Sequence, residues 1–192
     1  MSNQPFNIHI GIAAPLIRDN IDTDQIIPSR EMKSVSKTGL SSGMFAGERY
    51  ISGREPNPDF VLNKTEYLDA TILLTGQNFG CGSSREHAVW ALKEYGFRAI
   101  IAQSFGEIFY NNCVRNGILP IVLAAELITK LPREVTIDLP AQTVAEFKFD
   151  MPEGDKKMLV EGLDMIAQTL AHEADIAAFL ERDKIKRPWI YC

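Results

Sequence analysis

Residues that could hold a metal cluster are scarce in this sequence. Cysteine and histidine occur three times each, and no two cysteines form a Cys-x-x-Cys pair. A disulfide framework needs an even set of cysteines, and iron–sulfur or structural zinc sites need about three or four clustered ligands. We therefore expect no disulfide framework and no metal held by this chain alone. Cys81 is interpreted as a small buried hydrophobic residue.

Long apolar runs and an excess of positive charge are also missing. No stretch approaches the roughly 18 apolar residues of a membrane helix, and no basic segment followed by an apolar one opens the sequence. The formal net charge is −5, whereas nucleic acids and anionic membranes select basic surfaces. We expect a cytoplasmic protein whose partners are neither nucleic acid nor membrane.

The middle of the sequence, in contrast, is strongly patterned. The 192 residues are 45% hydrophobic and 23% charged, which suits a single domain over residues 1–192. Apolar runs of strand length alternate with segments of helical spacing, and a strand pair follows. The predicted strands are residues 8–14, 70–75, 98–102, 118–123, 135–139 and 143–149. This order predicts an α/β fold of the β/β/α type, with a parallel βαβ core, a β-hairpin and a helical C-terminal extension over about residues 156–187.

Two sequences of the capping-box type open the predicted helices of this core. Ser83 with Glu86, and Ser104 with Glu107, each place a hydroxyl three residues before a carboxylate. Residues 31–43 differ from the core because they are rich in glycine and hydroxyl side chains, and we predict a mobile loop there.

The segment Gly80-Cys-Gly-Ser-Ser-Arg-Glu-His87 joins the predicted strand 70–75 to the next helix. Its glycines allow sharp turns, and its hydroxyls and guanidinium lie at a predicted helix N-terminus, where amides and the helix dipole attract anions. The segment fits neither a P-loop, which needs Lys before Ser83, nor a dinucleotide-binding fingerprint, nor a hydrolase nucleophile elbow. Helix capping explains Ser83 and Glu86 alone, whereas an anion site explains the whole segment. Chemistry leaves both interpretations open.

Two motifs in the sequence resemble signatures of one known family. Residues 78–88, Asn-Phe-Gly-Cys-Gly-Ser-Ser-Arg-Glu-His-Ala, resemble the serine-loop signature of the aconitase superfamily. Residues 21–28, Ile-Asp-Thr-Asp-Gln-Ile-Ile-Pro, resemble a second signature of the same domain. The similarity extends to residues 96–102, 104–105 and 117–120. Length and layout resemble the small subunits of the two-subunit hydro-lyases in that superfamily, which implies an aconitase-like swivelling domain.

The resemblance also implies a reaction. In this superfamily water is removed from a hydroxy acid and added back at the neighbouring carbon. A [4Fe–4S] cluster with one open iron polarises the departing hydroxyl, and in two-subunit members the large subunit holds that cluster. The implied arrangement is a heterodimer or heterotetramer in which this chain binds no cofactor, supplies half of the active site and is inactive alone.

Carried over by position, the resemblance gives each part of the two signatures a role. Ser83 is the catalytic base that removes a proton from carbon, Ser84 and Arg85 bind a substrate carboxylate, and Gly82 permits close approach of the backbone. Asp24 is a catalytic residue that orients a histidine of the large subunit, with a helix cap or Asx-turn as the alternative. The neighbouring polar residues are interpreted as structural: Asp22, Thr23, Glu86 and His87.

In this superfamily the loop after the second signature selects the substrate's variable group. Between Glu31 and Glu48 this chain has no arginine for an additional carboxylate. The apolar residues that could meet an isopropyl group are Met32, Val35 and Leu40, although Lys33 and Lys37 could meet an anion.

The expected function is therefore the interconversion of 2-isopropylmalate and 3-isopropylmalate in leucine biosynthesis. Two alternatives stay open. One is the small subunit of a related dehydratase for 2-methylmalate (citraconate), dimethylmalate or homoaconitate, because one or two methyl groups change binding modestly. The other is a non-catalytic anion-binding module that uses the same helix terminus.

Overall fold

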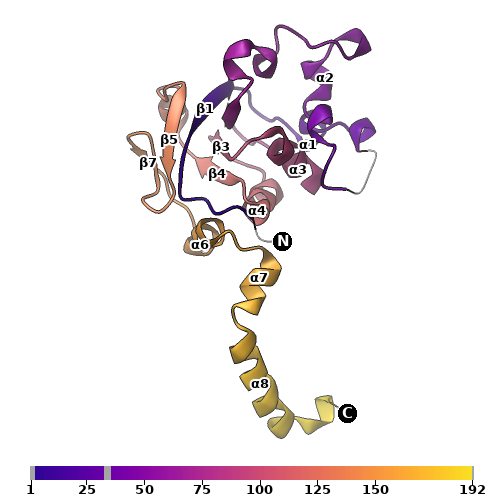
Figure 1. Cartoon of the computed structure of the whole chain (residues 1–192), viewed down its shortest axis with the longest axis vertical. Helices are drawn as coiled ribbons and strands as arrows, with labels where there is room; N and C mark the ends of the chain where they lie inside the picture. Colours follow the sequence, from indigo (N-terminus) through magenta and orange to yellow (C-terminus); the bar gives the residue numbers. More distant parts are fainter. Residues whose placement is uncertain (1–2, 33–35, 192) are drawn as a thin grey trace.

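The computed structural model describes residues 3–32 and 36–191, which form a seven-stranded sheet flanked by helices (Figure 1). The strands are β1 Ile8–Leu16, β2 Ala70–Thr75, β3 Ala99–Ala102, β4 Leu119–Val122, β5 Glu134–Asp138, β6 Thr143–Val144 and β7 Phe147–Lys148. Their order across the sheet is β4-β3-β2-β1-β5-β6-β7. Strands β1 to β4 run parallel, whereas β5 pairs antiparallel with β1, and β6 and β7 continue antiparallel. The predicted α/β class with a parallel core is confirmed.

The helices alternate with the parallel strands, as the βαβ pattern requires. They are α1 Thr23–Ile26, α2 Ala46–Arg49, α3 Glu86–Tyr95, α4 Glu107–Asn116, α5 Ala125–Ile128, α6 Glu153–Glu161, α7 Met165–Leu170 and α8 Glu173–Lys186. Residues 52–67 contain only short 3-10 turns. Helices α3, α4 and α5 follow β2, β3 and β4 as the helical spacing predicts, whereas the short helices α1 and α2 between β1 and β2 were not predicted.

The parallel strands β2 and β3 appear in the sequence as continuous apolar runs because apolar side chains pack on both faces of the sheet. On one face, Leu73 and Ile100 pack in a cluster that includes Leu92 of α3. On the other, Ile72 and Ile101 pack in a cluster that includes Ile128 and Leu159 of α5 and α6. Strands covered on both sides lose the alternation of polar and apolar residues. Burial on both faces gives the carboxyl ends of β2 and β3 a rigid base.

The predicted hairpin is confirmed, but its second strand is shorter than predicted. Strand β5 pairs with β6, and Asp138 lies opposite Thr143. Ala145 then adopts a positive φ of 50°, and β6 turns into β7. A left-handed residue cannot continue a strand, so residues 143–149 divide into two two-residue strands.

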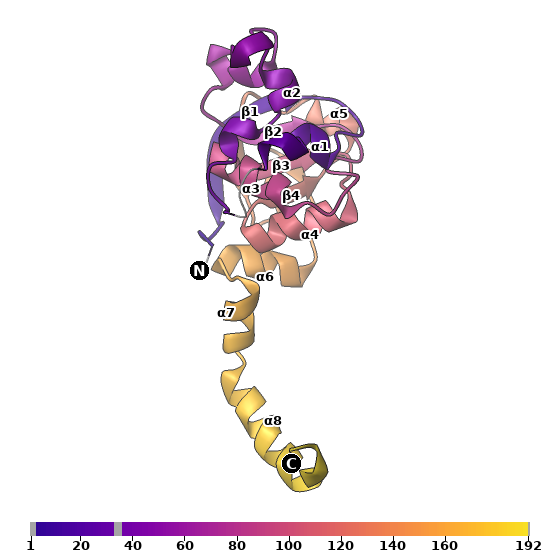
Figure 2. The ribbon, with the colours of Figure 1, turned by 90° about the vertical axis from the view of Figure 1, so that its right-hand side faces the viewer.

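The C-terminal helices form two parts. Helix α6 belongs to the body of the domain, where Leu159 is buried and its carbonyl accepts a 2.9 Å hydrogen bond from the Phe6 amide. Helices α7 and α8 project from that body as an arm (Figures 1 and 2). Asp183 accepts hydrogen bonds from Arg187 Nε and Tyr191 Oη, both at 2.7 Å, and folds the last turn back on α8. The predicted extension is thus helical, and it leaves the body only after α6.

The arm carries many exposed apolar side chains, among them Ile166, Leu170, Phe179, Ile185, Trp189 and Ile190. Among the residues that the structure describes, no helix has the length and apolar character needed to cross a membrane.

Candidate active site

The serine loop, residues 76–85, crosses the sheet edge at the carboxyl end of β2. Backbone hydrogen bonds fix it on two sides: the Gly80 amide donates to Ile21 O at 2.7 Å, and the Phe79 amide donates to Ser104 O at 3.0 Å. The Asn78 amide donates to Ser104 Oγ at 2.8 Å. The loop is therefore held between the segment that precedes α1 and the segment that precedes α4.

The two glycines of the loop serve different purposes. Gly80 has a φ of 74°, and a side chain there would collide with the ring of Phe109. Gly82 has a φ of 90°, but its nearest neighbour would be Asp22 Cβ at 3.5 Å, so only conformation restricts it. Gly82 is exposed, which leaves its backbone open to a ligand.

The two predicted capping boxes are wrong. Helix α3 begins at Glu86 with Arg85 at the N-cap, and no side chain caps it. Glu86 Oε1 instead accepts a 2.7 Å hydrogen bond from Asn116 Nδ2. Helix α4 begins at Glu107 after Gly106, and Ser104 Oγ is used by the serine loop. In both cases the chain turns into the helix two residues later than the motif suggests, so the serine does not reach the first amides.

Ser83 and Ser84 are consequently available to a ligand. Both residues are exposed, and neither hydroxyl has a hydrogen-bond partner within the described parts of the chain. The Ser83 carbonyl is engaged, because it accepts from the Arg85 amide at 2.8 Å and from Thr23 Oγ1 at 3.1 Å. The backbone of Ser83 is fixed while its side chain is free.

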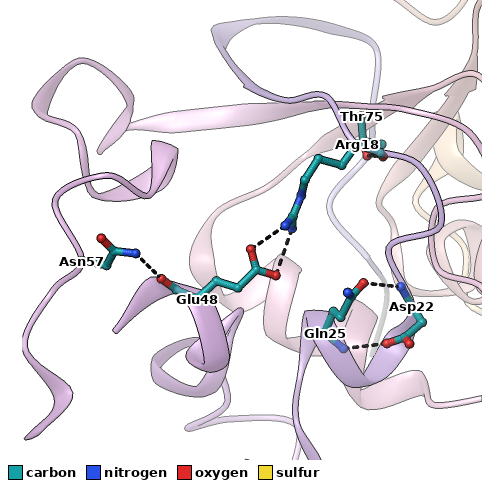
Figure 3. A network of polar contacts seen from close by, with 6 residues as sticks. All are labelled: Arg18, Asp22, Gln25, Glu48, Asn57 and Thr75. Carbon is teal, nitrogen blue, oxygen red and sulfur yellow. Dashed lines mark hydrogen bonds and ion pairs between the residues drawn. The ribbon is translucent and has the colours of Figure 1, made fainter. Parts of the chain in front are cut away.

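The second signature lies directly against the serine loop. Asp22 and Cys81 form a parallel bridge, and the Thr23 amide donates to Cys81 O at 3.0 Å. Asp22 caps α1: its Oδ1 accepts from the Gln25 amide at 2.7 Å, and Gln25 Oε1 accepts from the Asp22 amide at 3.0 Å (Figure 3). Asp22 and Thr23 thus have structural roles, as interpreted from the sequence.

Asp24 reaches across to the serine loop. Its carboxylate forms an ion pair with Arg85 Nη1 and accepts a 3.2 Å hydrogen bond from Ser29 Oγ. The Arg85 guanidinium has the largest effect on the pKa of Asp24 and lowers it. Burial raises this pKa and the hydrogen bond from Ser29 lowers it again, so the pKa of Asp24 is lowered overall. Since the pair occupies Nη1, the edge formed by Nε and Nη2 has no partner among the described residues, and that edge has the fork geometry that binds carboxylates.

The ion pair makes one assembly from residues about sixty positions apart. Arg85 is partly buried, with 23% of its side chain exposed, whereas 55% of the Asp24 side chain is exposed. Arg85 is therefore anchored, and Asp24 keeps a face open to a partner. Ser29 was not identified from the sequence as a partner of Asp24. Its position five residues after Asp24 was the only signal for this hydrogen bond.

A bridge between Arg18 and Glu48 closes the region beside α1. Figure 3 shows the two side chains meeting, with Arg18 Nη1 2.6 Å from Glu48 Oε2 and Arg18 Nη2 3.0 Å from Oε1. Glu48, Asp24 and Arg30 are among the residues that line a hollow of about 480 Å³. Arg30 lies just outside the 31–48 interval in which the sequence was searched for an arginine, and it was missed for that reason.

The residues proposed to select the substrate do not behave alike. Met32 is partly buried and packs against the core, and Leu40 is buried with 2% exposed. Leu40 therefore anchors the loop in the core. Val35 and Lys33 lie outside the described residues. Lys37 Nζ lies 5.0 Å from the centre of the Trp90 ring on α3.

Cys81 is only partly buried, which corrects its interpretation as a small buried hydrophobic residue. Cys113 is fully buried, and burial raises the pKa of its thiol. His87 lies against Trp90 with 4.7 Å between ring centres. In the described part of the chain, no group of three or more His, Cys, Asp or Glu side chains is placed to hold a metal ion. Cys81, Cys113 and His87 therefore do not form the ligand set of an iron–sulfur cluster, and we assign no cluster ligand to them.

Comparisons with known proteins agree with these observations. The family model of the aconitase C-terminal domain matches residues 3–126. The chain is 54% identical to a 3-isopropylmalate dehydratase small subunit of Cupriavidus necator, over 98% of both chains. It is 46% identical to that of Leptothrix cholodnii, over 97% of both. A crystal structure of 3-isopropylmalate dehydratase (leuD) from Methanocaldococcus jannaschii superposes with a TM-score of 0.68 at 28% identity, covering 89% of this chain and 98% of that one.

Proposed function

This chain belongs to the family of 3-isopropylmalate dehydratase small subunits, within the aconitase C-terminal domain family, and on that premise we propose how its residues take part in the reaction. The enzyme interconverts 2-isopropylmalate and 3-isopropylmalate by dehydration and rehydration, as a lyase of leucine biosynthesis. As a small subunit, this chain has a large subunit as its partner.

Ser83 is the base in this proposal. During dehydration its oxygen takes the proton from the carbon next to the one that bears the departing hydroxyl, and during rehydration it returns a proton. The electron pair of the broken C–H bond forms the double bond of the unsaturated intermediate as hydroxide leaves. The single observation that carries the assignment is that the Ser83 hydroxyl is exposed and uncommitted while its backbone is fixed by Thr23 and Arg85.

A serine hydroxyl is a weak base, so its alkoxide needs stabilisation. The beginning of α3 and the Arg85 guanidinium provide positive potential next to Ser83. The free Nε–Nη2 edge of Arg85 and the Ser84 hydroxyl would bind a carboxylate of the substrate. Asp24 holds Arg85 in place and presents its exposed face to a histidine of the large subunit.

The cofactor of the proposal is a [4Fe–4S] cluster bound by the large subunit, whose open iron polarises the departing hydroxyl. The aconitase-family membership supports this assignment. The residues of this chain supply only proton transfer and carboxylate binding, so neither half is complete without the other. A cytoplasmic location, in keeping with a biosynthetic enzyme, is part of the same proposal.

The isolated chain is expected to be folded but inactive. Purified small subunit should show no measurable turnover of 3-isopropylmalate, and addition of the cluster-loaded large subunit under anaerobic conditions should restore activity. Circular dichroism of the isolated chain is the control for folding. Turnover by the small subunit alone at the rate of the complex would contradict the proposal.

The complex is expected to prefer 3-isopropylmalate over citrate by about two orders of magnitude in kcat/KM, because the loop between Glu31 and Glu48 offers no arginine to a third carboxylate and Arg30, just before it, is paired with Glu31. The measurement compares 3-isopropylmalate, 2-methylmalate, homocitrate and citrate with one enzyme preparation. A preference for citrate would overturn the assignment of this loop. A smaller difference is expected between 3-isopropylmalate and 2-methylmalate, because both are malates with one alkyl substituent and no third carboxylate.

A further inference from the structure

Glu94, near the end of α3, binds three consecutive backbone amides of the loop that follows the second signature. Its Oε1 accepts from the Gly39 amide at 2.6 Å, and its Oε2 accepts from the Leu40 and Ser41 amides at 2.6 Å and 2.8 Å. Successive amides that converge on one anion form a strong, charge-assisted contact. The Gly39 amide is the main cause of the lowered pKa of Glu94, in keeping with a carboxylate that accepts from three amides.

The loop base is closed by separate contacts. Arg54 Nη1 pairs with Glu31 at 3.0 Å, and Arg54 Nη2 donates to Ser42 O at 2.8 Å. Gly43 lies so close to Glu31 that a side chain at this glycine would be 2.6 Å from Glu31 Cβ. The two ends of residues 31–43 therefore meet through contacts that do not involve Glu94.

Along α3, the loop makes two further contacts. The Leu40 side chain is buried in the core cluster that also contains Leu92 of α3. The Lys37 ammonium lies over Trp90, one helical turn before Glu94. Glu94 thus holds the backbone of residues 39–41 against α3, by contacts separate from those that close the base.

Helix α3 connects this contact to the reaction. The helix is ten residues long, about 15 Å, and it begins immediately after Arg85. We infer that Glu94 is a positioning residue: through the amides of residues 39–41 it sets the distance between the loop that meets the alkyl group of the substrate and the serine loop at the other end of the helix. This inference rests on the proposed function of both loops.

Gly39 makes the contact geometry attainable. Its φ of 84° turns successive amides toward one point, and a side chain there would meet no atom within 4 Å. Gly39→Ala therefore strains the loop without a clash, and it provides a second variant that leaves the Glu94 carboxylate intact.

The test uses the assembled enzyme with Glu94→Gln, Glu94→Ala and Gly39→Ala. For each, kcat and KM are measured with 3-isopropylmalate and with 2-methylmalate. We expect KM for 3-isopropylmalate to rise about tenfold, kcat to stay within about twofold, and the preference for 3-isopropylmalate over 2-methylmalate to fall about fivefold. Glu126→Gln, an exposed carboxylate on α5, is the matched control and should change none of these.

Hydrogen exchange provides an independent readout. The amides of residues 39–41 should exchange faster in Glu94→Gln, because the glutamine oxygen carries no charge and its NH2 group faces the same amides. If exchange accelerates but the preference between the two substrates is unchanged, the inference is overturned and Glu94 is only structural. A fall in kcat with an unchanged KM would overturn it as well.

Failure of the inference can be separated from failure of the proposed function. If Ser83→Ala abolishes turnover while the Glu94 variants keep the native KM and preference, only the role of Glu94 is wrong. If Ser83→Ala remains fully active, the proposed function of the serine loop is wrong, whatever the Glu94 variants do.

Discussion

Ser83→Ala in the assembled enzyme is expected to lower kcat by about a thousandfold while KM changes little. The expectation follows from the surroundings of the hydroxyl. It is exposed, its backbone is held by Thr23 and Arg85, and the adjacent Ser84 hydroxyl is assigned to a substrate carboxylate and not to proton transfer. The His87 ring is packed against Trp90.

The variant should fold and assemble normally, because Ser83 Oγ makes no hydrogen bond among the described residues and does not cap α3. Iron content of the complex and its elution volume are the controls. Kinetics under anaerobic conditions give kcat and KM separately. A loss of less than about tenfold with full cluster occupancy would mean that another group removes the proton.

Arg85→Gln is expected to lower kcat/KM by about a hundredfold to a thousandfold, through a higher KM and a lower kcat, because the guanidinium binds a carboxylate and stabilises the Ser83 alkoxide in this proposal. The guanidinium is expected to bind a substrate carboxylate through the Nε–Nη2 edge that Asp24 leaves free. Glutamine keeps part of the shape but neither the charge nor the two parallel donors. Arg85→Lys keeps the charge alone, and it should recover less than half of the lost free energy of binding because Lys cannot make the bidentate contact.

Arg85→Gln should also change how kcat/KM depends on pH at the acid end of the profile. Arg85 holds the pKa of Asp24 below its ordinary value, so Asp24 in the native protein stays ionised as the pH falls through the usual range of an aspartate. The ion pair is fully formed above that ordinary value and is lost as the pH falls through the lowered pKa. In Arg85→Gln the pKa of Asp24 rises, and the acid limb of the kcat/KM profile should move to higher pH. An unmoved acid limb would exclude Asp24 as its source.

Much of the fold could be predicted because the sequence carries local signals for it. The apolar runs at residues 70–75 and 98–102 lie within elements buried on both faces, so their composition alone identifies them. The two signatures also lie in contact, as expected when residues that follow neighbouring parallel strands meet at one sheet edge.

The capping boxes could not be judged in the same way. The Ser-x-x-Glu spacing at Ser83 and at Ser104 is compatible with a cap, but the fold uses Ser104 Oγ for the Asn78 amide and Glu86 for Asn116. These partners lie 26 and 30 residues away along the chain, beyond any local pattern. The failed cap at Ser83 strengthens the proposal of a ligand site, because it leaves the hydroxyl free.

The loop after the second signature was hardest to predict. Leu40 looked like a substrate contact because apolar residues are rare in that loop, yet it is buried and anchors the chain. Glu94 carries no local signal at all, since its partners are backbone amides at least 53 residues away. Contacts between a side chain and a distant backbone depend on tertiary structure, and composition does not reveal them.

The central claim is that two adjacent, exposed hydroxyls have different roles, and one comparison tests it most directly. Ser83→Ala and Ser84→Ala are assembled with the same large subunit, and kcat and KM for 3-isopropylmalate are measured side by side at full cluster occupancy. The account predicts that kcat collapses about a thousandfold in Ser83→Ala, whereas Ser84→Ala raises KM about tenfold and keeps kcat within about tenfold. Equal losses of kcat in the two variants, or a larger loss in Ser84→Ala, would contradict it.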